Sequence, residues 1–286
     1  MESLICICGA GTMGRGIALA CAMEDISVIV YDLNPAVLAG ASSAIGEELD
    51  RALEKKRISA EERESVGQRI RFISDLSACR APIIIEAIIE KEEAKSALFM
   101  KLADINNPDT LFASNSSSLS ITRIAEQTTF PERVVGLHFF NPANRMKLVE
   151  IIRTRHNPDP LIERLQALCR HLKKTPVVCQ DTPGFIVNRV ARMYYLEALR
   201  LAGQSGIDME SIDQLMESAG FPMGPFHLMD LIGLDINYSV SSAVYEDLGR
   251  PARMKPSPLQ EDLVRQGFLG KKTGRGFFSY GHSDKA

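Results

Sequence analysis

The sequence predicts an α/β fold in which a doubly wound, mostly parallel sheet is followed by a C-terminal all-helical domain. Three observations support this prediction. The chain opens with a strand, a glycine-rich turn, a helix and a second strand, and strand and helix patterns then alternate to about residue 182. After Asp181-Thr182-Pro183-Gly184 only helical patterns remain. We therefore predict two domains, residues 1–182 and 183–286, which are joined by a Pro-Gly linker.

The first strand is expected at 4–8, a short apolar run that leads into a G-x-G-x-x-G motif at 9–14. A helical pattern follows, and a second apolar run at 26–31 ends at Asp32. This order of strand, glycine turn, helix, strand and acid is typical of a Rossmann-like dinucleotide-binding unit. The alternative is a tight glycine turn in some other α/β protein, but the strands, the helix and the acid all agree with a dinucleotide site.

Each glycine of the motif has a separate role in this interpretation. Gly9 allows the sharp turn, Gly11 lets the backbone approach a pyrophosphate, and Gly14 lets the helix pack closely on the sheet. The phosphates then lie at the positive end of the helix, and Asp32 accepts hydrogen bonds from the adenosine ribose. A carboxylate there repels a 2′-phosphate, so NAD is favoured over NADP. The predicted cofactor contacts of this unit are Gly9, Ala10, Gly11, Thr12, Met13, Gly14 and Asp32.

The rest of the first domain continues the alternation of strands and helices. Apolar runs bounded by turn residues predict further strands, and amphipathic patterns predict further helices. The expected strands are 70–74, 82–90, 110–113, 133–139, 146–153 and 175–179. The expected helices are 35–56, one that begins near Ser59, 91–105, 120–126 and 158–173.

The second domain is expected to contain only helices. They are predicted at 185–202, 208–218, 225–248 and 258–266, and a loop rich in glycine and cations follows at 270–276. The pattern at 225–248 is apolar on most sides, which suggests a helix shared with a partner subunit. We therefore expect a homodimer.

Composition narrows the classes of function. A formal net charge of −3 over 286 residues argues against a nucleic-acid partner, and no apolar run approaches the roughly 20 residues of a membrane span. The first residues form a strand that the fold needs, so no signal or transit peptide is expected. The six cysteines show no metal-ligand spacing, and most lie in apolar patterns. We therefore expect no metal, reduced cysteines and a cytoplasmic protein.

His138 and Glu150 are the residues that most strongly suggest chemistry. His138 lies in an apolar strand before Phe-Phe-Asn-Pro, and Glu150 lies in the next strand. The turn at Pro142 allows neighbouring strands to bring the two side chains together. A carboxylate beside an imidazole fixes its tautomer and stabilises the imidazolium, which makes the other nitrogen a better base. The residues alone leave a structural ion pair as an equal alternative.

Further polar groups fall where ligands bind in open α/β sheets, at the carboxyl ends of strands. Glu90 ends the predicted strand 82–90, and the cluster Ser114-Asn115-Ser116-Ser117-Ser118 follows the next strand. The cluster is interpreted as an N-cap for the following helix, as a polar cradle for a ligand, or as both. The basic patch Lys55-Lys56-Arg57 is either a solvated helix end or a site for phosphates.

Seven motifs carry a resemblance to a known family. In chain order they are GAGTMG, SNSSSL, GLHFFNP, KLVEII, DTPGFIVNR, PMGPFHLMDLIGLD and GKKTGRGF. The chain resembles the 3-hydroxyacyl-CoA dehydrogenase family over nearly its whole length, in the single-function form similar to bacterial 3-hydroxybutyryl-CoA dehydrogenases. The resemblance implies hydride transfer between (S)-3-hydroxyacyl-CoA and NAD, with a short-chain substrate such as 3-hydroxybutyryl-CoA. It also implies a homodimer formed through the helical domain.

The resemblance also implies roles for individual residues. His138 would be the general base, Glu150 would support it, and Ser117 would contact the substrate oxygen near the nicotinamide. Asn188 would polarise the substrate from the second domain, so the domains must close on the reactants. The implied cofactor contacts are Glu90, Lys95, Ser117, Asn141 and Lys272. The implied substrate contacts are Ser117, Asn188 and Lys55, the last of which would bind the CoA phosphates.

Two departures from the family pattern bear on specificity. Ser116 stands where threonine is common, and Asn144-Arg145 replaces the usual Pro-Val. Arg145 is interpreted as part of a surface or interdomain ion pair, or as a group that recognises the distal carboxylate of a 3-hydroxydicarboxylyl-CoA. The other functions considered are a dehydrogenase of free hydroxy acids and a non-catalytic NAD-binding protein. The basic patch favours a CoA ester, and the retained histidine and carboxylate favour an enzyme.

Overall fold

The structure is a computed structural model that describes residues 2–281. The outermost residues of the two predicted domains, 1 and 282–286, lie outside the described residues. The chain forms two compact units that are divided between Thr182 and Pro183.

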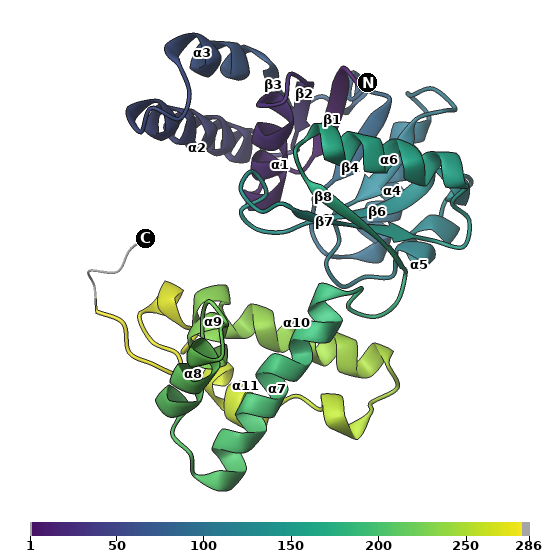
Figure 1. The fold of residues 1–286 in the computed structure, drawn as a ribbon. Helices are drawn as coiled ribbons and strands as arrows, with labels where there is room; N and C mark the ends of the chain where they lie inside the picture. Colours follow the sequence, from purple (N-terminus) through teal and green to yellow (C-terminus); the bar gives the residue numbers. More distant parts are fainter. Residues whose placement is uncertain (1, 282–286) are drawn as a thin grey trace. The chain divides into compact units, whose positions relative to one another are not determined.

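The first unit contains an eight-stranded sheet (Figure 1). Its strands are β1 (Leu4–Cys8), β2 (Ser27–Tyr31), β3 (Ile70–Ile73), β4 (Ile83–Glu86), β5 (Leu111–Ser114), β6 (Val134–Phe139), β7 (Leu148–Arg153) and β8 (Thr175–Gln180). Their order in the sheet is β3-β2-β1-β4-β5-β6-β7-β8, and every neighbouring pair is parallel except β6 with β7. The predicted mostly parallel, doubly wound sheet is confirmed. The strand order reverses between β1 and β4, which is where such sheets bind ligands.

Six α-helices surround the sheet. They are α1 (Thr12–Ala22), α2 (Pro35–Glu54), α3 (Ala60–Gln68), α4 (Glu92–Ala103), α5 (Ile121–Glu126) and α6 (Asp159–His171). Local sequence fixes where several of them begin. The Asn34 side chain accepts the backbone N–H of Ala36 at the start of α2, and Ser59 with Glu62 forms a capping box at α3.

The two faces of the sheet are covered by different helices. Alternate strand residues such as Ile7 and Val135 pack with α1, α2 and α6 in a single apolar core, and we name this side the apolar face. The intervening residues point toward α4 and α5. There the ring of Phe112 on β5 packs on Phe99 of α4, with centroids 5.3 Å apart.

The second side, which we name the polar face, also carries buried polar groups. Glu86, Ser114, His138 and Glu150 alternate with the core residues of β4, β5, β6 and β7, and all four are buried. Close packing on this face depends on Gly136, because a Cβ there would come within 2.6 Å of Ile152. The strands therefore bring a group of polar side chains into a well-packed interior.

The fourth strand is shorter than the predicted run 82–90, and this prediction is wrong at its end. Strand pairing stops at Glu86, because the backbone N–H of Ile88 donates to the Glu86 carboxylate at 2.6 Å instead of to a neighbouring strand. Residues 87–91 form a loop. Glu90 therefore lies beyond the strand, in the approach to α4.

The second unit is helical, as predicted. Its helices are α7 (Val187–Ser205), α8 (Met209–Ser218), α9 (Pro225–Ile232), α10 (Leu234–Asp247) and α11 (Pro258–Arg265). The single helix predicted at 225–248 is wrong, because Gly233 separates α9 from α10. Its φ of +102° is open to glycine but strained for other residues. Within the described part of the chain, we find no helix with the length and apolarity needed to cross a membrane.

Two buried aspartates hold the segments of the second unit together. Asp213 of α8 accepts two backbone N–H groups at the start of α9, at 2.9 and 2.8 Å. Asp230 of α9 accepts the backbone N–H groups of 277–278 and the hydroxyl of Tyr280, all within 3.0 Å. These bonds satisfy the buried carboxylates and fix the glycine-rich C-terminal loop.

Candidate active site

The glycine-rich loop joins β1 to α1. Gly9 has a φ of +104°, and a Cβ there would overlap the carbonyl oxygen of Ala87. A Cβ on Gly14 would overlap the carbonyl oxygen of Gly9. The fold itself therefore requires both glycines. A Cβ on Gly11 would meet no atom within 4 Å, so only a ligand lying on the loop would require glycine at that position.

The start of α1 offers hydrogen-bond donors to an anion. Gly11 is the N-cap, and no side chain caps the first turn. Asp32 directly follows β2, and its carboxylate accepts the backbone N–H groups of Ala10 at 2.9 Å and Asn34 at 3.0 Å. The acid is therefore fixed beside the glycine loop. This arrangement fits the pyrophosphate and the ribose hydroxyls of NAD.

A buried ion pair lies at the end of β4, beside β1. The Nζ atom of Lys95 on α4 lies 2.6 Å from Oε1 of Glu86, and the two side chains are 1% and 0% exposed. The hydroxyl of Ser114 donates to the other oxygen of Glu86 at 2.7 Å. Burial raises the pKa of Glu86, although Lys95 and the hydrogen bonds oppose this effect. The pair ties α4 to the carboxyl edge of the sheet.

The serine-rich loop at 114–118 is held by Glu90. The Ser116 hydroxyl and the backbone N–H of Ser117 donate to one oxygen of Glu90 at 2.6 and 3.0 Å, and Lys95 lies 3.2 Å from the other oxygen. Burial favours a raised pKa for Glu90, but the charge of Lys95 and these hydrogen bonds hold it below its usual value. Ser120, outside the cluster, caps α5. The cluster therefore does not cap the helix, and only Ser117 and Ser118 of it are partly exposed to a ligand.

His138 and Glu150 face each other in register across β6 and β7. The Nδ1 atom of His138 lies 2.8 Å from Oε2 of Glu150, and the side chains are 7% and 1% exposed. The prediction that neighbouring strands bring them together is therefore confirmed. The Phe140 ring packs beside the imidazole, with centroids 4.5 Å apart. Because the carboxylate engages Nδ1, proton transfer would take place at Nε2.

The loop at 140–147 lies against α1. A Cβ on Gly16 would come within 3.2 Å of the Cβ of Ala143, so the loop and the helix approach closely. The buried ammonium group of Lys174 donates to two carbonyl oxygens of the loop, at 2.7 and 2.9 Å. Asn141, an expected cofactor contact, is exposed in this loop. The segment that carries it is thus anchored beside the first helix of the dinucleotide-binding unit.

Arg145 and Asn144 of the same loop bind Glu48 of α2. The Asn144 amide donates to the Glu48 carboxylate at 2.7 Å, and the Arg145 guanidinium lies 3.3 Å from the same oxygen. The interpretation of Arg145 as part of a surface ion pair is confirmed within the first unit. Its side chain is nevertheless 65% exposed, so it retains surface for a ligand.

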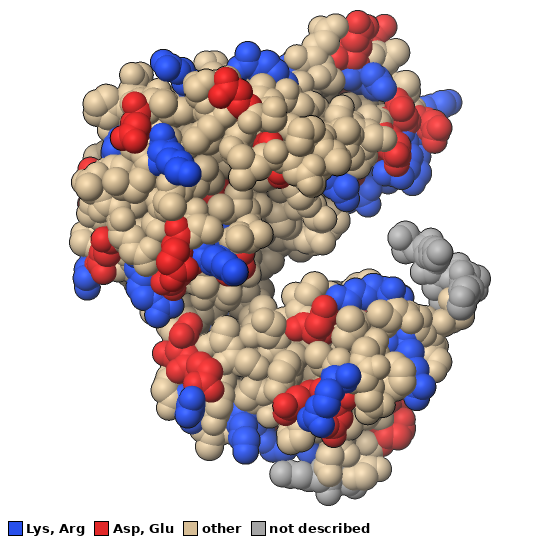
Figure 2. Space-filling view, turned by 180° about the vertical axis from the view of Figure 1, so that it is seen from behind, with Lys and Arg blue, Asp and Glu red and all other residues tan. Residues whose placement is uncertain are grey.

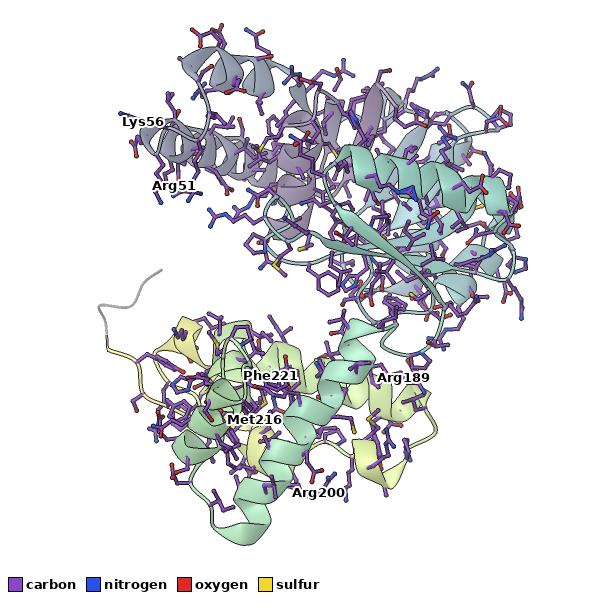
Figure 3. The ribbon with its side chains drawn as sticks, in the orientation of Figure 1. Arg51, Lys56, Arg189, Arg200, Met216 and Phe221 are labelled. Carbon is purple, nitrogen blue, oxygen red and sulfur yellow. The ribbon has the colours of Figure 1, made fainter. Side chains whose placement is uncertain are left out.

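A cavity of about 180 Å³ lies between α1, α2 and this loop. Its lining combines apolar side chains with four cations, Arg51, Lys55, Arg57 and Arg145, and it also includes Glu48 and Asn144. We name it the cationic cavity. Figure 3 shows Arg51 and Lys56 near the end of α2. Figure 2 shows that basic (blue) and acidic (red) side chains are interspersed over the face of the molecule drawn there. Four cations against the one carboxylate of Glu48 leave an excess of positive charge, which favours an anionic ligand such as a phosphate.

The second unit carries two further expected site residues. Asn188 lies in the first turn of α7, where its backbone carbonyl oxygen accepts a hydrogen bond from the buried Arg192 at 2.9 Å. Arg192 also donates to two oxygens of α10, at 2.9 and 2.8 Å, so it ties the start of α7 to α10. The Nζ atom of Lys272 lies 2.6 Å from the carboxylate of Asp235.

Two buried charged residues of this site, Glu86 and Lys174, are not predicted from the sequence. Glu86 does carry a signal, because a carboxylate inside an apolar central strand must find a partner. Lys174 carries none, because its partners are backbone carbonyl oxygens that any sequence would supply.

Comparisons with known proteins identify the two units. Residues 4–182 match the family described as "3-hydroxyacyl-CoA dehydrogenase, NAD binding domain". Residues 184–280 match the family described as "3-hydroxyacyl-CoA dehydrogenase, C-terminal domain". The two matches together span nearly the whole chain.

Individual relatives agree with these matches. The "3-hydroxyadipyl-CoA dehydrogenase" of Escherichia coli (strain K12) is 42% identical over 96% of this chain and 58% of that protein. The "Probable 3-hydroxybutyryl-CoA dehydrogenase" of Bacillus subtilis (strain 168) is 40% identical over 96% of both chains. A crystal structure of 3-hydroxybutyryl-CoA dehydrogenase from E. coli K12 matches with a TM-score of 0.96 and 41% identity, over 100% of this chain and 61% of that one. The chain thus spans less than two thirds of both E. coli proteins.

Proposed function

The chain belongs to the 3-hydroxyacyl-CoA dehydrogenase family, and from this premise we propose that it oxidises (S)-3-hydroxyacyl-CoA with NAD to 3-oxoacyl-CoA and NADH. The observation that carries the proposal is the buried pairing of His138 with Glu150 at 2.8 Å. NAD bound on the glycine-rich loop supplies the acceptor for the hydride on C3 of the substrate. The proton of the 3-hydroxyl group needs a base, and we assign that role to His138.

The His138–Glu150 pair has the two properties that such a base needs. With the Glu150 carboxylate at Nδ1, we assign the uptake of the hydroxyl proton to Nε2, the other ring nitrogen. The imidazolium that forms then lies beside a buried carboxylate, where the attraction between opposite charges is poorly screened by water. In the reverse direction the imidazolium returns the proton to the substrate oxygen. General-base catalysis of this kind contributes about 10²–10⁴-fold to the rate.

We assign the positioning of the substrate oxygen to Ser117 and Asn188. The backbone N–H of Ser117 is held by Glu90, so the position of its hydroxyl depends on the Glu90–Lys95 pair. The position of Asn188 likewise depends on Arg192, because the Arg192 guanidinium donates a hydrogen bond to the backbone carbonyl oxygen of Asn188. The proposed contacts to NAD beyond the glycine loop are Glu90, Lys95, Ser117, Asn141 and Lys272.

We assign the cationic cavity to the phosphates of CoA. Lys55 and Arg145 both line this cavity, and the ion pair with Glu48 holds the Arg145 guanidinium there. We therefore assign Arg145 to the phosphates rather than to the acyl group. This assignment favours a short-chain ester such as 3-hydroxybutyryl-CoA over a 3-hydroxydicarboxylyl-CoA. A free hydroxy acid carries no phosphates that four cations would bind, so the cavity favours a CoA ester over a free acid.

An NADH absorbance assay tests the substrate proposal. We expect oxidation of NADH with acetoacetyl-CoA, and slower turnover with longer 3-oxoacyl-CoAs and with 3-oxoadipyl-CoA. Arg145→Ala should raise KM for every ester by a similar factor, because the phosphates are common to all. A loss confined to 3-oxoadipyl-CoA would instead assign Arg145 to a distal carboxylate. No turnover with any ester would refute the dehydrogenase proposal.

The cofactor assignment has a separate test at Gly11. Its Cβ position faces open space, so Gly11→Ala should leave the free energy of unfolding almost unchanged. The added methyl group would obstruct a pyrophosphate, so the Kd for NADH should rise at least about tenfold, equivalent to about 1.4 kcal/mol. Fluorescence titration measures the Kd and urea unfolding measures the stability. Unchanged NADH binding would contradict the assignment of the loop.

We further propose that the protein is a cytoplasmic homodimer. Leu231, Ile232 and Ile236 lie exposed on α9 and α10, where a second copy of the chain would cover them. The free thiols of the cysteines are compatible with a reducing compartment. Light scattering during gel filtration should give the mass of a dimer, and Ile236→Glu should lower it toward a monomer. Leu33→Glu, at an exposed apolar site of the first unit, is the matched control.

A further inference from the structure

Three buried thiols meet on the polar face, and the proposed dehydrogenase chemistry uses none of them. Cys6 and Cys8 lie on β1, and Cys79 follows the short 3₁₀ helix Leu76–Ala78 in the crossover from β3 to β4. Their sulfur atoms all lie within 4.8 Å of one another, and all three residues are 0% exposed. We name them the thiol cluster. Spacing along the chain does not predict it, because Cys79 is brought to the other two only by the fold.

The geometry of the thiol cluster suits one soft ion. Zinc–thiolate bonds of about 2.3 Å place sulfur atoms roughly 4 Å apart around a three-coordinate centre, which is within the observed limit. Among residues 2–281, no fourth histidine, cysteine or carboxylate joins the group within the same limit. We propose that Cys6, Cys8 and Cys79 form a three-thiolate site for one thiophilic ion that accepts three ligands, of the class of Cu(I) or trivalent arsenic.

The three thiols of the cluster interact with one another through hydrogen bonds. Hydrogen bonds from Cys6 and then Cys8 lower the pKa of Cys79, although burial opposes this effect. The pKa of Cys6 is raised, first by its hydrogen bond with Cys79, and that of Cys8 is raised, first by its hydrogen bond with Cys6. A cation such as Cu(I) would displace the protons of the thiols that bind it. The positive charge of Arg71 favours the thiolate forms of Cys6 and Cys79.

The burial of the cluster determines which of the candidate ions should bind most strongly. Three thiolates around Cu(I) leave an excess of negative charge, which is costly to bury. Arsenous acid reacts with three thiols to give a neutral trithiolate and releases three water molecules, with no oxidant or reductant involved. The interior therefore favours arsenic over copper. Zinc favours four ligands, and the cluster provides three, so zinc should bind more weakly than either.

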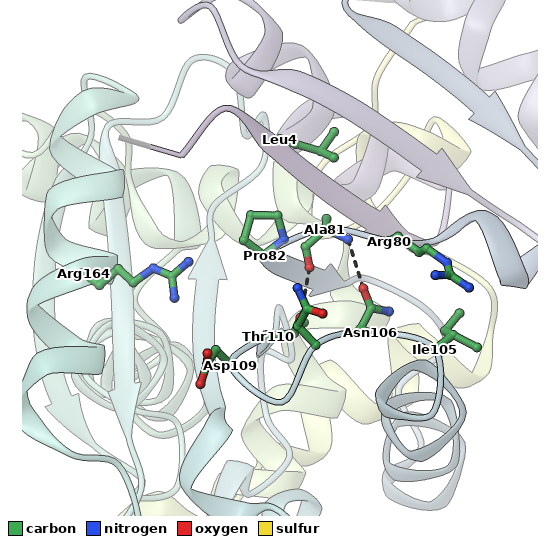
Figure 4. Close-up of a pocket in the computed structure, with 10 residues that line it drawn as sticks. Leu4, Arg80, Ala81, Pro82, Ile105, Asn106, Asp109, Thr110 and Arg164 are labelled. Atoms are coloured by element: carbon green, nitrogen blue, oxygen red, sulfur yellow. Dashed lines mark hydrogen bonds between the residues drawn. The ribbon is translucent and has the colours of Figure 1, made fainter.

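A cavity adjoins the chain segments that carry the thiol cluster, at the edge of the sheet opposite the glycine-rich loop. It has a volume of about 380 Å³ and lies where β1, β4 and β5 begin (Figure 4). Leu4 lines it and shares one face of β1 with Cys6 and Cys8, while Arg80 and Ala81 line it directly after Cys79. The side-chain amide of Asn106 donates to the carbonyl oxygen of Cys79 at 2.8 Å and accepts the N–H of Ala81 at 3.0 Å. Asn106, which lines the cavity, thus anchors the segment 79–81 between the cavity and the thiol cluster.

Titration of the reduced, full-length protein tests the proposal. Arsenite is added in one series and buffered Cu(I) in another, and the ultraviolet thiolate-to-ion absorption and the intact mass of the native protein are recorded. We expect one arsenic and one copper per chain, with zinc binding at least about tenfold more weakly. The arsenic adduct should also raise Tm, because the ion binds the folded chain.

Matched variants decide which thiols bind. Cys79→Ser, in the crossover, and Cys8→Ser, in the strand, should each raise the Kd for arsenite at least about tenfold. Cys169→Ser, a buried cysteine of α6, should leave it unchanged. Circular dichroism and NADH binding confirm that each variant is folded. No bound arsenic, or equal binding by the Cys79→Ser variant and the wild type, would show that the cluster is only a packed group of core thiols.

Discussion

The two faces of the sheet carry different kinds of residue on the same strands. On the apolar face, side chains such as Ile85 and Leu137 pack into one core with α1, α2 and α6. On the polar face, the residues next to them in the chain are Glu86 and His138, each buried and paired with an opposite charge or a carboxylate. Each strand therefore anchors the fold with one set of side chains and builds the candidate site with the other. Stability and chemistry should be separable at adjacent positions.

The largest expected effect separates chemistry from folding on the polar face. His138→Gln or Glu150→Gln should lower kcat by about 10²–10⁴, because each removes the base or its support. NADH affinity, measured by fluorescence titration, should change little, since neither residue belongs to the glycine loop. Near-normal kcat in both variants would contradict the assignment of the pair.

The second effect concerns a polar residue that serves the fold. Glu86→Ala should lower the free energy of unfolding by about 3–5 kcal/mol, because it leaves the buried Lys95 without its nearest partner. Urea unfolding at neutral pH measures the change. Glu93→Ala, at an exposed position of α4, is the matched control and should stay within about 0.5 kcal/mol of the wild type. Equal stability of the two variants would show that the pair contributes little.

The apolar face should respond in stability alone. Leu165 of α6 is fully buried in the core, so Leu165→Ala should cost about 2–5 kcal/mol of unfolding free energy by leaving a cavity. Its kcat, measured below the unfolding transition, should stay close to the wild-type value. A loss of turnover as large as that of the His138 variant would remove the distinction between the two faces.

The smallest expected effect is a dependence on pH at Glu90. Its pKa is lower in the folded chain than in the unfolded chain, so its stabilising contribution is complete above the unfolded value of about 4.3. The contribution is lost as pH falls through the folded value. The difference in unfolding free energy between wild type and Glu90→Gln should therefore be largest near neutral pH and shrink in acid. A difference that is constant with pH would argue against the Lys95–Glu90 interaction.

Most of the fold can be predicted because buried parallel strands are continuous apolar runs. The ends of two elements, β4 and α9, cannot be predicted in this way. β4 ends at Glu86 because a side chain captures the N–H of Ile88, and α9 ends at Gly233 because its φ is positive. Glycine within the helical pattern at 225–248 is a signal for a break, but the apolar periodicity on both sides conceals it.

The candidate site is predictable only where its residues are close in the chain or share a motif. His138 and Glu150 are separated by a single turn, so strand pairing could be anticipated. The cationic cavity and the thiol cluster could not, because Lys55 meets Arg145 and Cys6 meets Cys79 only after the crossovers are formed. Long-range contacts of this kind leave no periodic pattern in the sequence.

The tethered carboxylate of Asp32 has a consequence for attempts to exchange the coenzyme. Each of its oxygens accepts one backbone N–H group, from Ala10 or from Asn34. Replacing the acid with a basic or apolar residue would remove the repulsion of an extra phosphate, but it would also release the glycine-rich loop to which we assign the coenzyme. Asp32→Asn removes the charge and keeps an acceptor for Ala10, so it is the better starting point for redesign.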